Sequence, residues 1–264
     1  MKKQVVISKR HGSMTSGIFF RIAVVALAAC VICPIAQARQ KPNTLTPRQE
    51  QDGWKLLFNG KNLNGWHSYG EHGVGKDWSV HEGSIQLKKP SAAKFADFAD
   101  LVTDEQYTNF DLKVDWRAKP GIDSGIMFDV HESPKYHQTY QTGPEMQIAD
   151  LASTEPDSRT LLERAGDMFG LIPVPYEWVM PAGQWNHYEI IVDHGHVQFF
   201  MEGHRVVDTQ LWTPEWKQLV SGSKFAHWPG FAAYHSGHIS LQGTEDKGKS
   251  HVKLWFRNIM VRKL

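Results

Sequence analysis

The chain has 264 residues, of which 41% are apolar and 22% are charged, with 29 basic against 28 acidic residues. This length is enough for one large domain or two small ones with a buried core. The near-neutral balance lacks the basic footprint that nucleic-acid binding requires, so we expect no nucleic-acid partner.

The first residues have the three parts of a secretory signal peptide. Basic residues precede a short apolar run from Ile22 to Ile32, and Ala36-Gln37-Ala38 provides a small-residue cleavage site. The run is too short for a membrane span, and Pro34 follows it closely. We therefore expect residues 1–38 to be removed on export to the periplasm or the medium. Removing five of the 29 basic residues leaves 24 against 28 acidic residues.

A second interpretation of the same segment is a lipoprotein signal. Leu27-Ala28-Ala29-Cys30 resembles a lipobox, in which Cys30 would carry the lipid and anchor the protein to a membrane. The apolar run continues through Cys33, whereas lipoproteins usually turn polar there. Both interpretations stay open. Cleavage after Ala38 would remove both cysteines and leave no disulfide, thiol nucleophile or zinc–thiolate site.

From Trp54 to Leu264 the sequence repeats one pattern, after a polar linker at residues 39–53. Short alternating runs are separated by Gly, Asn, Asp and Pro, which indicates strands and turns. A single helix is expected near Thr213 to Leu219, with Thr213 as N-cap and Pro214 at the first helical position. The predicted strand segments are WSVHEGSIQL, FDLKVDWRA, SGIMFDV, GPEMQIAD, WNHYEIIVD, HVQFFMEGHRVVDTQ, GHISLQ and VKLWFRNIMVRKL. Turns are expected within the first of these at His81-Glu82-Gly83 and within HVQFFMEGHRVVDTQ at Glu202-Gly203-His204.

Many short strands without βα alternation predict an all-β fold, an antiparallel sandwich or barrel. No internal repeat or change in composition divides the chain after the linker, so we expect one domain at residues 54–264.

Several familiar functional motifs are absent from the sequence, among them dinucleotide and Walker loops, a G-x-S-x-G elbow and H-E-x-x-H. His194-Gly195-His196 fits a turn between two strands better than a metal pair. His235-Ser236-Gly237-His238 is the stronger candidate for a metal or active site, because it precedes a strand in a loop-rich region. Trp228 lies in irregular sequence, where an aromatic ring can belong to the core or stack on a sugar.

The segment GPEMQIAD, from Gly143 to Asp150, raises a question about its polar positions. Read as a strand, it puts Met146 and Ile148 on one face and Glu145 and Gln147 on the other. Glu145 and Gln147 would then face either water or a binding cleft.

The sequence also resembles the 3-keto-disaccharide hydrolase family along nearly its whole length after the predicted signal. GWKLLFNGKNLNGW (53–66), YTNFDLKVDWRAKPGIDSGIMF (107–128), TGPEMQIAD (142–150) and RAGDMFGLIP (164–173) follow in the family's order and spacing. The resemblance implies a concanavalin-A-like jelly roll in an exported bacterial protein. It also implies cleavage of glycosides that are already oxidised to a ketone at C3 of the sugar.

Such a reaction needs a base near C2, a stabiliser for the enolate oxygen and an acid for the leaving oxygen. With the resemblance, Glu145 becomes a candidate base, hydroxyl contact or metal ligand in a concave cleft. Arg117 is the candidate for stabilising the enolate, and His187 is a candidate acid or base. The candidate substrate contacts are Asp123, Ser124, Gln147, Asp150, Gln242, Trp228 and His235.

The sequence departs from the family pattern after Gln242, where GTEDKGKS stands in place of the usual Asp-His-Gly. Glu245 or Asp246 could substitute only if that loop folds back. A divalent metal ion is possible, but no ligand spacing selects one. The alternatives to an enzyme are a carbohydrate-binding module of the cell envelope without chemistry and a structural envelope protein, since fold alone does not determine function.

Overall fold

The computed structural model describes residues 40–87, 100–150, 161–243 and 254–264. The chain divides into residues 1–39 and a compact unit from Gln40 to Leu264. The predicted signal peptide and Cys30 therefore lie outside the described residues. No helix in the described part is long and apolar enough to cross a membrane.

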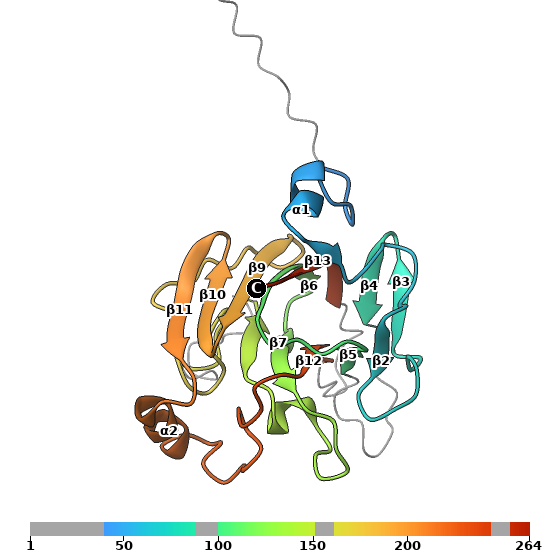
Figure 1. The fold of residues 1–264 in the computed structure, drawn as a ribbon. Helices are drawn as coiled ribbons and strands as arrows, with labels where there is room; N and C mark the ends of the chain where they lie inside the picture. The colour runs from blue at the N-terminus through green and yellow to red at the C-terminus, as the bar shows by residue number, and fades with distance from the viewer. Residues whose placement is uncertain (1–39, 88–99, 151–160, 244–253) are drawn as a thin grey trace, which may run out of the picture. The chain divides into compact units, whose positions relative to one another are not determined.

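Two antiparallel sheets form the compact unit (Figure 1), which confirms the predicted all-β sandwich of jelly-roll type. The large sheet has the strand order β11-β10-β9-β6-β13-β4-β3, with β1 paired to β13, and the small sheet has the order β2-β5-β12-β7-β8. The strands are β1 Lys55–Leu56, β2 Trp66–Ser68, β3 Trp78–His81, β4 Ser84–Leu87, β5 Leu101–Thr103, β6 Phe110–Ala118, β7 Asp123–Val130, β8 Glu145–Ala149, β9 Asn186–Asp193, β10 His196–Met201, β11 His204–Gln210, β12 His238–Leu241 and β13 Leu254–Lys263.

Three hairpins of the large sheet turn on a residue followed by glycine. Glu82-Gly83, His194-Gly195 and Glu202-Gly203 all have positive φ at both positions. Two successive positive φ values are what a two-residue hairpin of type I′ needs, and glycine adopts the second without strain. The predicted turns at these three places are confirmed, including the turn assignment of His194-Gly195-His196.

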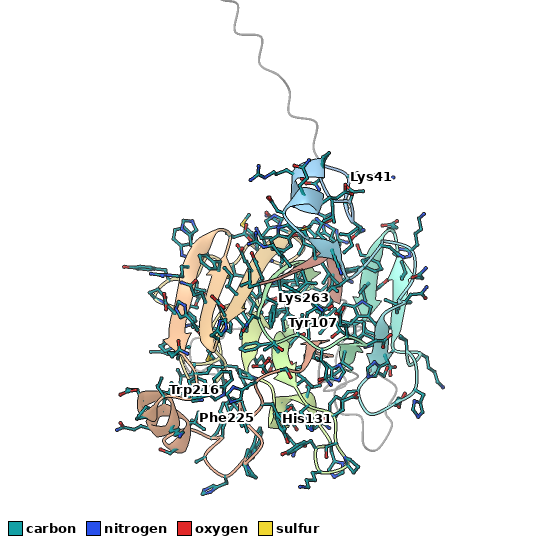
Figure 2. The ribbon with its side chains drawn as sticks, viewed as in Figure 1. Lys41, Tyr107, His131, Trp216, Phe225 and Lys263 are labelled. Atoms are coloured by element: carbon teal, nitrogen blue, oxygen red, sulfur yellow. The ribbon has the colours of Figure 1, made fainter. Side chains whose placement is uncertain are left out.

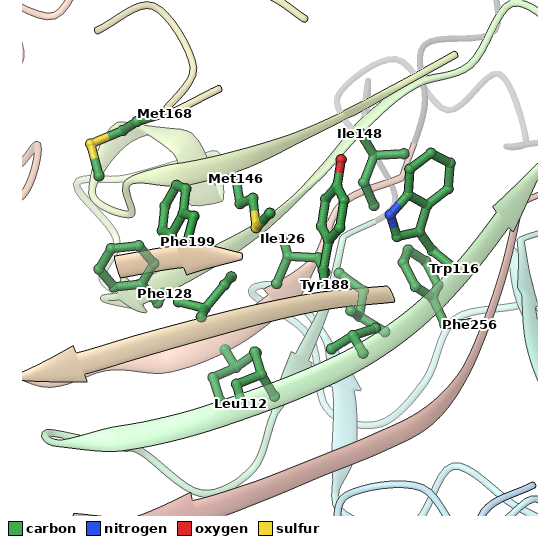
Figure 3. Packing of buried hydrophobic residues seen from close by; sticks show 14 of the residues in the cluster. Leu112, Trp116, Ile126, Phe128, Met146, Ile148, Met168, Tyr188, Phe199 and Phe256 are labelled. Atoms are coloured by element: carbon green, nitrogen blue, oxygen red, sulfur yellow. The ribbon is translucent and has the colours of Figure 1, made fainter. Parts of the chain in front are cut away.

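The core lies between the two sheets and follows the period-two alternation of the sequence. Figure 3 shows side chains from the large sheet, such as Trp116 and Tyr188, against those of the small sheet, such as Met146 and Ile148. The Trp116 and Tyr188 rings meet edge to face with centroids 5.4 Å apart. The Tyr188 hydroxyl donates to the carbonyl of Gln147 at 2.8 Å, so one hydrogen bond joins the two sheets inside the core.

Among the described residues, two α-helices lie outside the sheets, together with a 3₁₀ turn, η1, at Thr139–Gln141. Helix α2, Pro214–Ser221, begins as predicted, with the Thr213 hydroxyl accepting from the amide of Trp216. Helix α1, Pro47–Gln51, lies within the predicted linker and was not expected.

The predicted linker is part of the compact unit, because its backbone bonds to the large sheet. The amide of Asn43 donates to Asn258 Oδ1 at 2.7 Å, and the amide of Asn258 donates back to Asn43 Oδ1 at 2.8 Å. The compact unit therefore begins at Gln40, ahead of the expected domain start at residue 54.

A β-bulge at Asp129 shapes one end of the small sheet. Asp129 has a φ of 53°, and the register of β7 against β12 shifts between His238 and Ser240. A Cβ at Gly237 would overlap the backbone of Asp129, so glycine is required for this close approach. Burial raises the pKa of Asp129 to about 8, and its Oδ1 has no hydrogen-bond partner among the described residues.

The buried Asp129 carboxyl predicts a specific pH dependence of stability. An acid whose pKa is raised in the folded state binds more protons when folded than when unfolded. The free energy of unfolding of the native chain therefore falls as pH rises from about 4 to about 8. Asp129→Asn removes this loss. We expect the stability of the variant relative to the native chain to rise between pH 5 and pH 8, by up to roughly 4 kcal/mol over three pH units. Urea unfolding at both pH values measures it, and a difference that does not change with pH contradicts the assignment.

Candidate functional site

The outer face of the small sheet carries a row of residues that crosses all five strands. The strand registers pair Glu145 with Met127, Met127 with Ser240, Ser240 with Val102, and Val102 with His67. Four strand spacings of about 4.8 Å separate the ends of this cross-strand row by roughly 19 Å along the sheet. Glu145 therefore marks one end of the face, and His67 marks the other.

Gly125 leaves a hollow in the small sheet, and the Glu145 side chain packs into it. Gly125 pairs with Gln147 on the neighbouring strand, and a Cβ at position 125 would overlap the Glu145 carboxyl group. The absent side chain thus leaves a hollow in the sheet floor, and the Glu145 carboxyl occupies it. Alternation along β8 puts Gln147 on the same face, as the sequence predicts.

Burial and the neighbouring groups Asp123, Lys224 and Asp100 set the protonation of Glu145. Burial raises the pKa of Glu145 well above its usual value, and the nearby Asp123 carboxylate raises it further. The Lys224 ammonium opposes these effects. These surroundings favour the neutral, protonated form of Glu145, which can donate a proton.

Lys224 is the cation of the site. Its Nζ lies 3.4 Å from the centroid of the Phe169 ring. Its side chain reaches solvent, but partial burial at the ammonium end lowers its pKa, while Glu163, Glu145 and Asp123 act in the opposite direction. The amide of Phe169 donates to the Glu145 carbonyl at 3.0 Å, so one segment positions both groups.

A second row of polar residues runs beside the first. The Gln242 amide donates to the Gly125 carbonyl at 2.9 Å, and the next amide, of Gly243, donates to Asp100 Oδ1 at 2.9 Å. Burial raises the pKa of Asp100 to about 7, although hydrogen bonds from Thr139 and Gly243 partly offset this rise. Gln147, Gln242 and Asp100 thus extend the polar surface around Gly125.

Two buried polar atoms on this face are unsatisfied. Gln147 donates through Nε2 to Asp123 Oδ1 at 2.9 Å, but its Oε1 has no hydrogen-bond partner among the described residues. The Ser240 hydroxyl, in the middle of the cross-strand row, is also without one there. Buried polar atoms are rarely left unpaired, and exceptions often mark places where a ligand binds.

Aromatic rings border the cross-strand row near η1. Tyr140 packs on the patch that contains Met127, and its ring centroid lies 5.4 Å from that of Trp228. Trp228 in turn meets Phe225 edge to face at 5.3 Å. Figure 2 shows Phe225 on the same part of the molecule as Trp216 of α2. The site thus combines carboxyl, amide and hydroxyl groups with an aromatic wall.

Two of the predicted catalytic residues do not join this face, so the expected convergence of Glu145, Arg117 and His187 is wrong. Arg117 lies on the outer face of the large sheet, with its guanidinium 4.8 Å from the Trp185 ring and 4.6 Å from the Trp255 ring. His187 also lies on that face, where its Nδ1 is 2.6 Å from Asp115 Oδ1 beside a cavity of about 300 Å³. Alternation gave the correct outward direction for both but did not reveal that their strands belong to the other sheet.

Three of the predicted substrate contacts also have other structural partners. The Ser124 hydroxyl is buried and donates to the Gln242 carbonyl at 2.8 Å, while Asp150 accepts from the Gly121 amide at 2.8 Å. The exposed His235 ring stacks on Trp212 at 3.6 Å. Asp123, Gln147, Gln242 and Glu145 are brought together, and Trp228 joins them through Tyr140. Glu245 and Asp246 lie outside the described residues.

Sequence reasoning missed Lys224 and Asp100, because both lie in or beside loops where no periodicity indicates a face. It also missed His67, which carries no signal of its own in a strand of three residues. His238 was flagged only as part of a loop motif, whereas it begins β12 and is buried.

Comparison with known proteins provides independent information. The sequence profile of the 3-keto-alpha-glucoside-1,2-lyase-like domain matches residues 53–262. A protein of Bacteroides thetaiotaomicron named 3-keto-disaccharide hydrolase is 28% identical over 235 residues, which is 81% of this chain and 80% of that protein.

Solved structures from Parabacteroides distasonis, each described as a "putative glycosyl hydrolase", share the fold. One superposes with a TM-score of 0.74 at 26% identity, covering 85% of this chain and all of that one. Another gives a TM-score of 0.59 at 26% identity, covering 80% of this chain and 99% of the other.

The hollow at Gly125 can be tested by coupling two substitutions. Gly125→Ala forces the Glu145 carboxyl out of its position, and we expect a loss of about 1–3 kcal/mol in the free energy of unfolding. In a Glu145→Ala background the hollow is no longer occupied by the Glu145 carboxyl. There Gly125→Ala should change the free energy of unfolding much less. Urea unfolding of the four chains of this cycle measures the coupling.

The control is Gly222→Ala at the end of α2, where a Cβ would meet its nearest atom at an ordinary 3.6 Å. Equal effects of Gly125→Ala in both backgrounds would show that Glu145 does not occupy the hollow.

Proposed function

We propose a reaction from one premise: this chain belongs to the 3-keto-alpha-glucoside-1,2-lyase-like domain family, so it is an enzyme that acts on glycosidic bonds. The proposed substrate is a glycoside or disaccharide whose sugar already carries a ketone at C3. The proposed site is the outer face of the small sheet around Gly125.

The ketone makes bond cleavage possible without a nucleophile at C1. A base removes the proton on C2, and the electron pair of that bond forms the enolate of the C3 ketone. The enolate collapses back to the ketone, a C1–C2 double bond forms, and the group on C1 leaves with its bonding electrons and takes up a proton. Addition of water across the double bond completes a net hydrolysis.

The charged groups around Glu145 match the three roles that this reaction needs. Glu145, whose pKa is raised by burial, is placed to give its proton to the leaving oxygen. Lys224 supplies positive charge for the enolate oxygen. Asp123 is exposed and oriented by Gln147, which suits it to accept the C2 proton.

The single observation that carries the proposal is the buried Glu145 carboxyl above Gly125, in a polar face that has unsatisfied atoms. Gln147 Oε1 can accept a hydrogen bond from a sugar hydroxyl, and the Ser240 hydroxyl can exchange one with a second. The Tyr140–Trp228 wall can pack against the apolar face of a sugar ring.

Export is a further proposal, and it rests on the sequence of residues 1–38 alone. The basic start, the apolar run and the small-residue site favour a periplasmic or secreted protein, with lipid anchoring at Cys30 as the alternative.

Turnover of a chromogenic 3-keto glucoside beside its unoxidised parent tests the reaction. We expect cleavage of the keto compound only, and a fall in kcat of about 10²–10⁴-fold in Glu145→Gln, because a general acid contributes that much. The control is Glu189→Gln, which removes a carboxylate that pairs with Lys113 at 3.3 Å on the large sheet.

Near-normal turnover in folded Glu145→Gln would exclude the acid role of Glu145. Cleavage of the parent glucoside would point to a conventional glycosidase. Binding of either sugar without turnover would favour the carbohydrate-binding module.

The intact mass of the mature protein from a bacterial host tests export. We expect a chain that begins at Arg39. A lipid-modified chain that begins at Cys30 would establish the anchored form, and a chain that keeps residues 1–38 would contradict both.

A further inference from the structure

We infer that His67, His238 and Glu132 form a binding site for a divalent transition-metal cation, at the opposite end of the cross-strand row from Glu145. His67 belongs to β2, His238 begins β12, and Glu132 follows β7. Three strands that are not consecutive in sequence thus bring two imidazoles and one carboxylate together.

The three side chains converge on one oxygen atom. Glu132 Oε2 lies 2.9 Å from His67 Nε2 and 3.7 Å from His238 Nε2. The two imidazole rings are perpendicular, with centroids 5.7 Å apart. Both histidines therefore point the same ring nitrogen, Nε2, at the same carboxylate.

The other nitrogen of each ring is occupied in the way typical of metal ligands. His67 Nδ1 lies 2.7 Å from Asp104 Oδ1, and His238 Nδ1 lies 2.6 Å from the carbonyl oxygen of Thr103. Ligating histidines usually donate their second N–H to a carboxylate or a backbone carbonyl, which orients the ring and selects the tautomer. The Thr103 carbonyl can only accept, so Nδ1 of His238 carries the proton and Nε2 presents a lone pair.

The distances between the ligand atoms suit a common metal. Two donors at about 2.1 Å from one cation are roughly 3.0 Å apart at a right angle and about 3.4 Å apart at a tetrahedral angle. The 2.9 and 3.7 Å separations bracket these values. As the side chains stand, no group of three or more His, Cys, Asp or Glu residues in the described part of the chain is arranged to hold a metal ion. Binding therefore replaces the His67–Glu132 hydrogen bond and displaces Gln106 Nε2, which lies 3.0 Å from His238 Nε2.

Charge and access favour a cation as the occupant. With neutral imidazoles, Asp104 and Glu132 contribute two negative charges that a divalent ion balances. A third contact already fixes the carboxylate, because Glu132 Oε1 accepts from the Gly70 amide at 2.7 Å. A cavity of about 840 Å³ is lined by His67, Asp104 and Glu132, and it provides an entry path and room for water ligands.

The donor set selects the class of metal. Two imidazole nitrogens and one carboxylate oxygen suit Zn²⁺, Co²⁺ or Mn²⁺, whereas Ca²⁺ and Mg²⁺ prefer oxygen ligands throughout. The inference does not rest on the proposed reaction, because Glu145 lies roughly 19 Å away along the sheet and metal binding is measured without substrate.

Equilibrium dialysis of the tag-free mature chain that begins at Arg39, and so lacks Cys30 and Cys33, against Zn²⁺ and Co²⁺, followed by elemental analysis and Co²⁺ absorption spectra, tests the site. We expect one ion per chain and a Co²⁺ spectrum with the ligand-field bands of nitrogen and oxygen donors. His238→Gln and Glu132→Gln should each lower the affinity at least tenfold, and Asp104→Asn should lower it about 10–100-fold through the orientation of His67.

The matched control is His196→Gln, which breaks a His–Asp pair of 2.7 Å, with Asp208, on the large sheet, where no second histidine converges. It should leave stoichiometry and affinity unchanged. The inference is overturned if the native chain binds no ion, or if His196→Gln weakens binding as much as His238→Gln. Circular dichroism identifies any variant that fails to fold, and the remaining two substitutions then carry the test.

Discussion

The candidate site depends on one packing constraint. The acidic side chain of Glu145 occupies space that is free because the neighbouring strand has a glycine there. Gly125 leaves a hollow in the small sheet, and the Glu145 carboxyl lies in it, away from water and beside Asp123. Burial of a carboxyl group favours its neutral form, so this packing arrangement becomes a chemical property. The rest of the site follows from it: Lys224 moderates the charge, Gln147 orients Asp123, and aromatic rings border the face.

The sandwich explains why the outer faces of the two sheets have different properties. Trp116, Tyr188, Met146 and Ile148 fill the space between the sheets, so polar residues at alternate positions point outward on both sides. On the large sheet these positions contain paired groups, such as His187 with Asp115 and Arg117 between two tryptophans. On the small sheet they gather around Glu145 and include unsatisfied buried atoms at Gln147 and Ser240, although the large sheet also has such atoms, at Asp111, Arg117 and Arg262.

Alternation and turn residues were enough to predict much of the fold from sequence. They gave every strand of the described residues except β1, β2 and β5, the hairpins at Glu82-Gly83 and Glu202-Gly203, helix α2 and the outward direction of Glu145 and Gln147. They could not assign strands to sheets, because a period of two gives a side relative to the core and nothing about pairing partners. The prediction that Arg117 and His187 join Glu145 failed for that reason. Lys224, Asp100 and His67 are positioned by tertiary contacts that leave no local pattern, and α1 is too short and polar to show periodicity.

The most direct test of the central claim is a crystal structure of Glu145→Gln with a bound 3-keto glucoside. The sugar is predicted to lie on the outer face of the small sheet, over Gly125, with its hydroxyl groups bonded to Gln147 and its leaving oxygen at residue 145. A sugar bound instead beside His187 on the large sheet, or in the cavity lined by His67 and Glu132 with none over Gly125, would contradict the account.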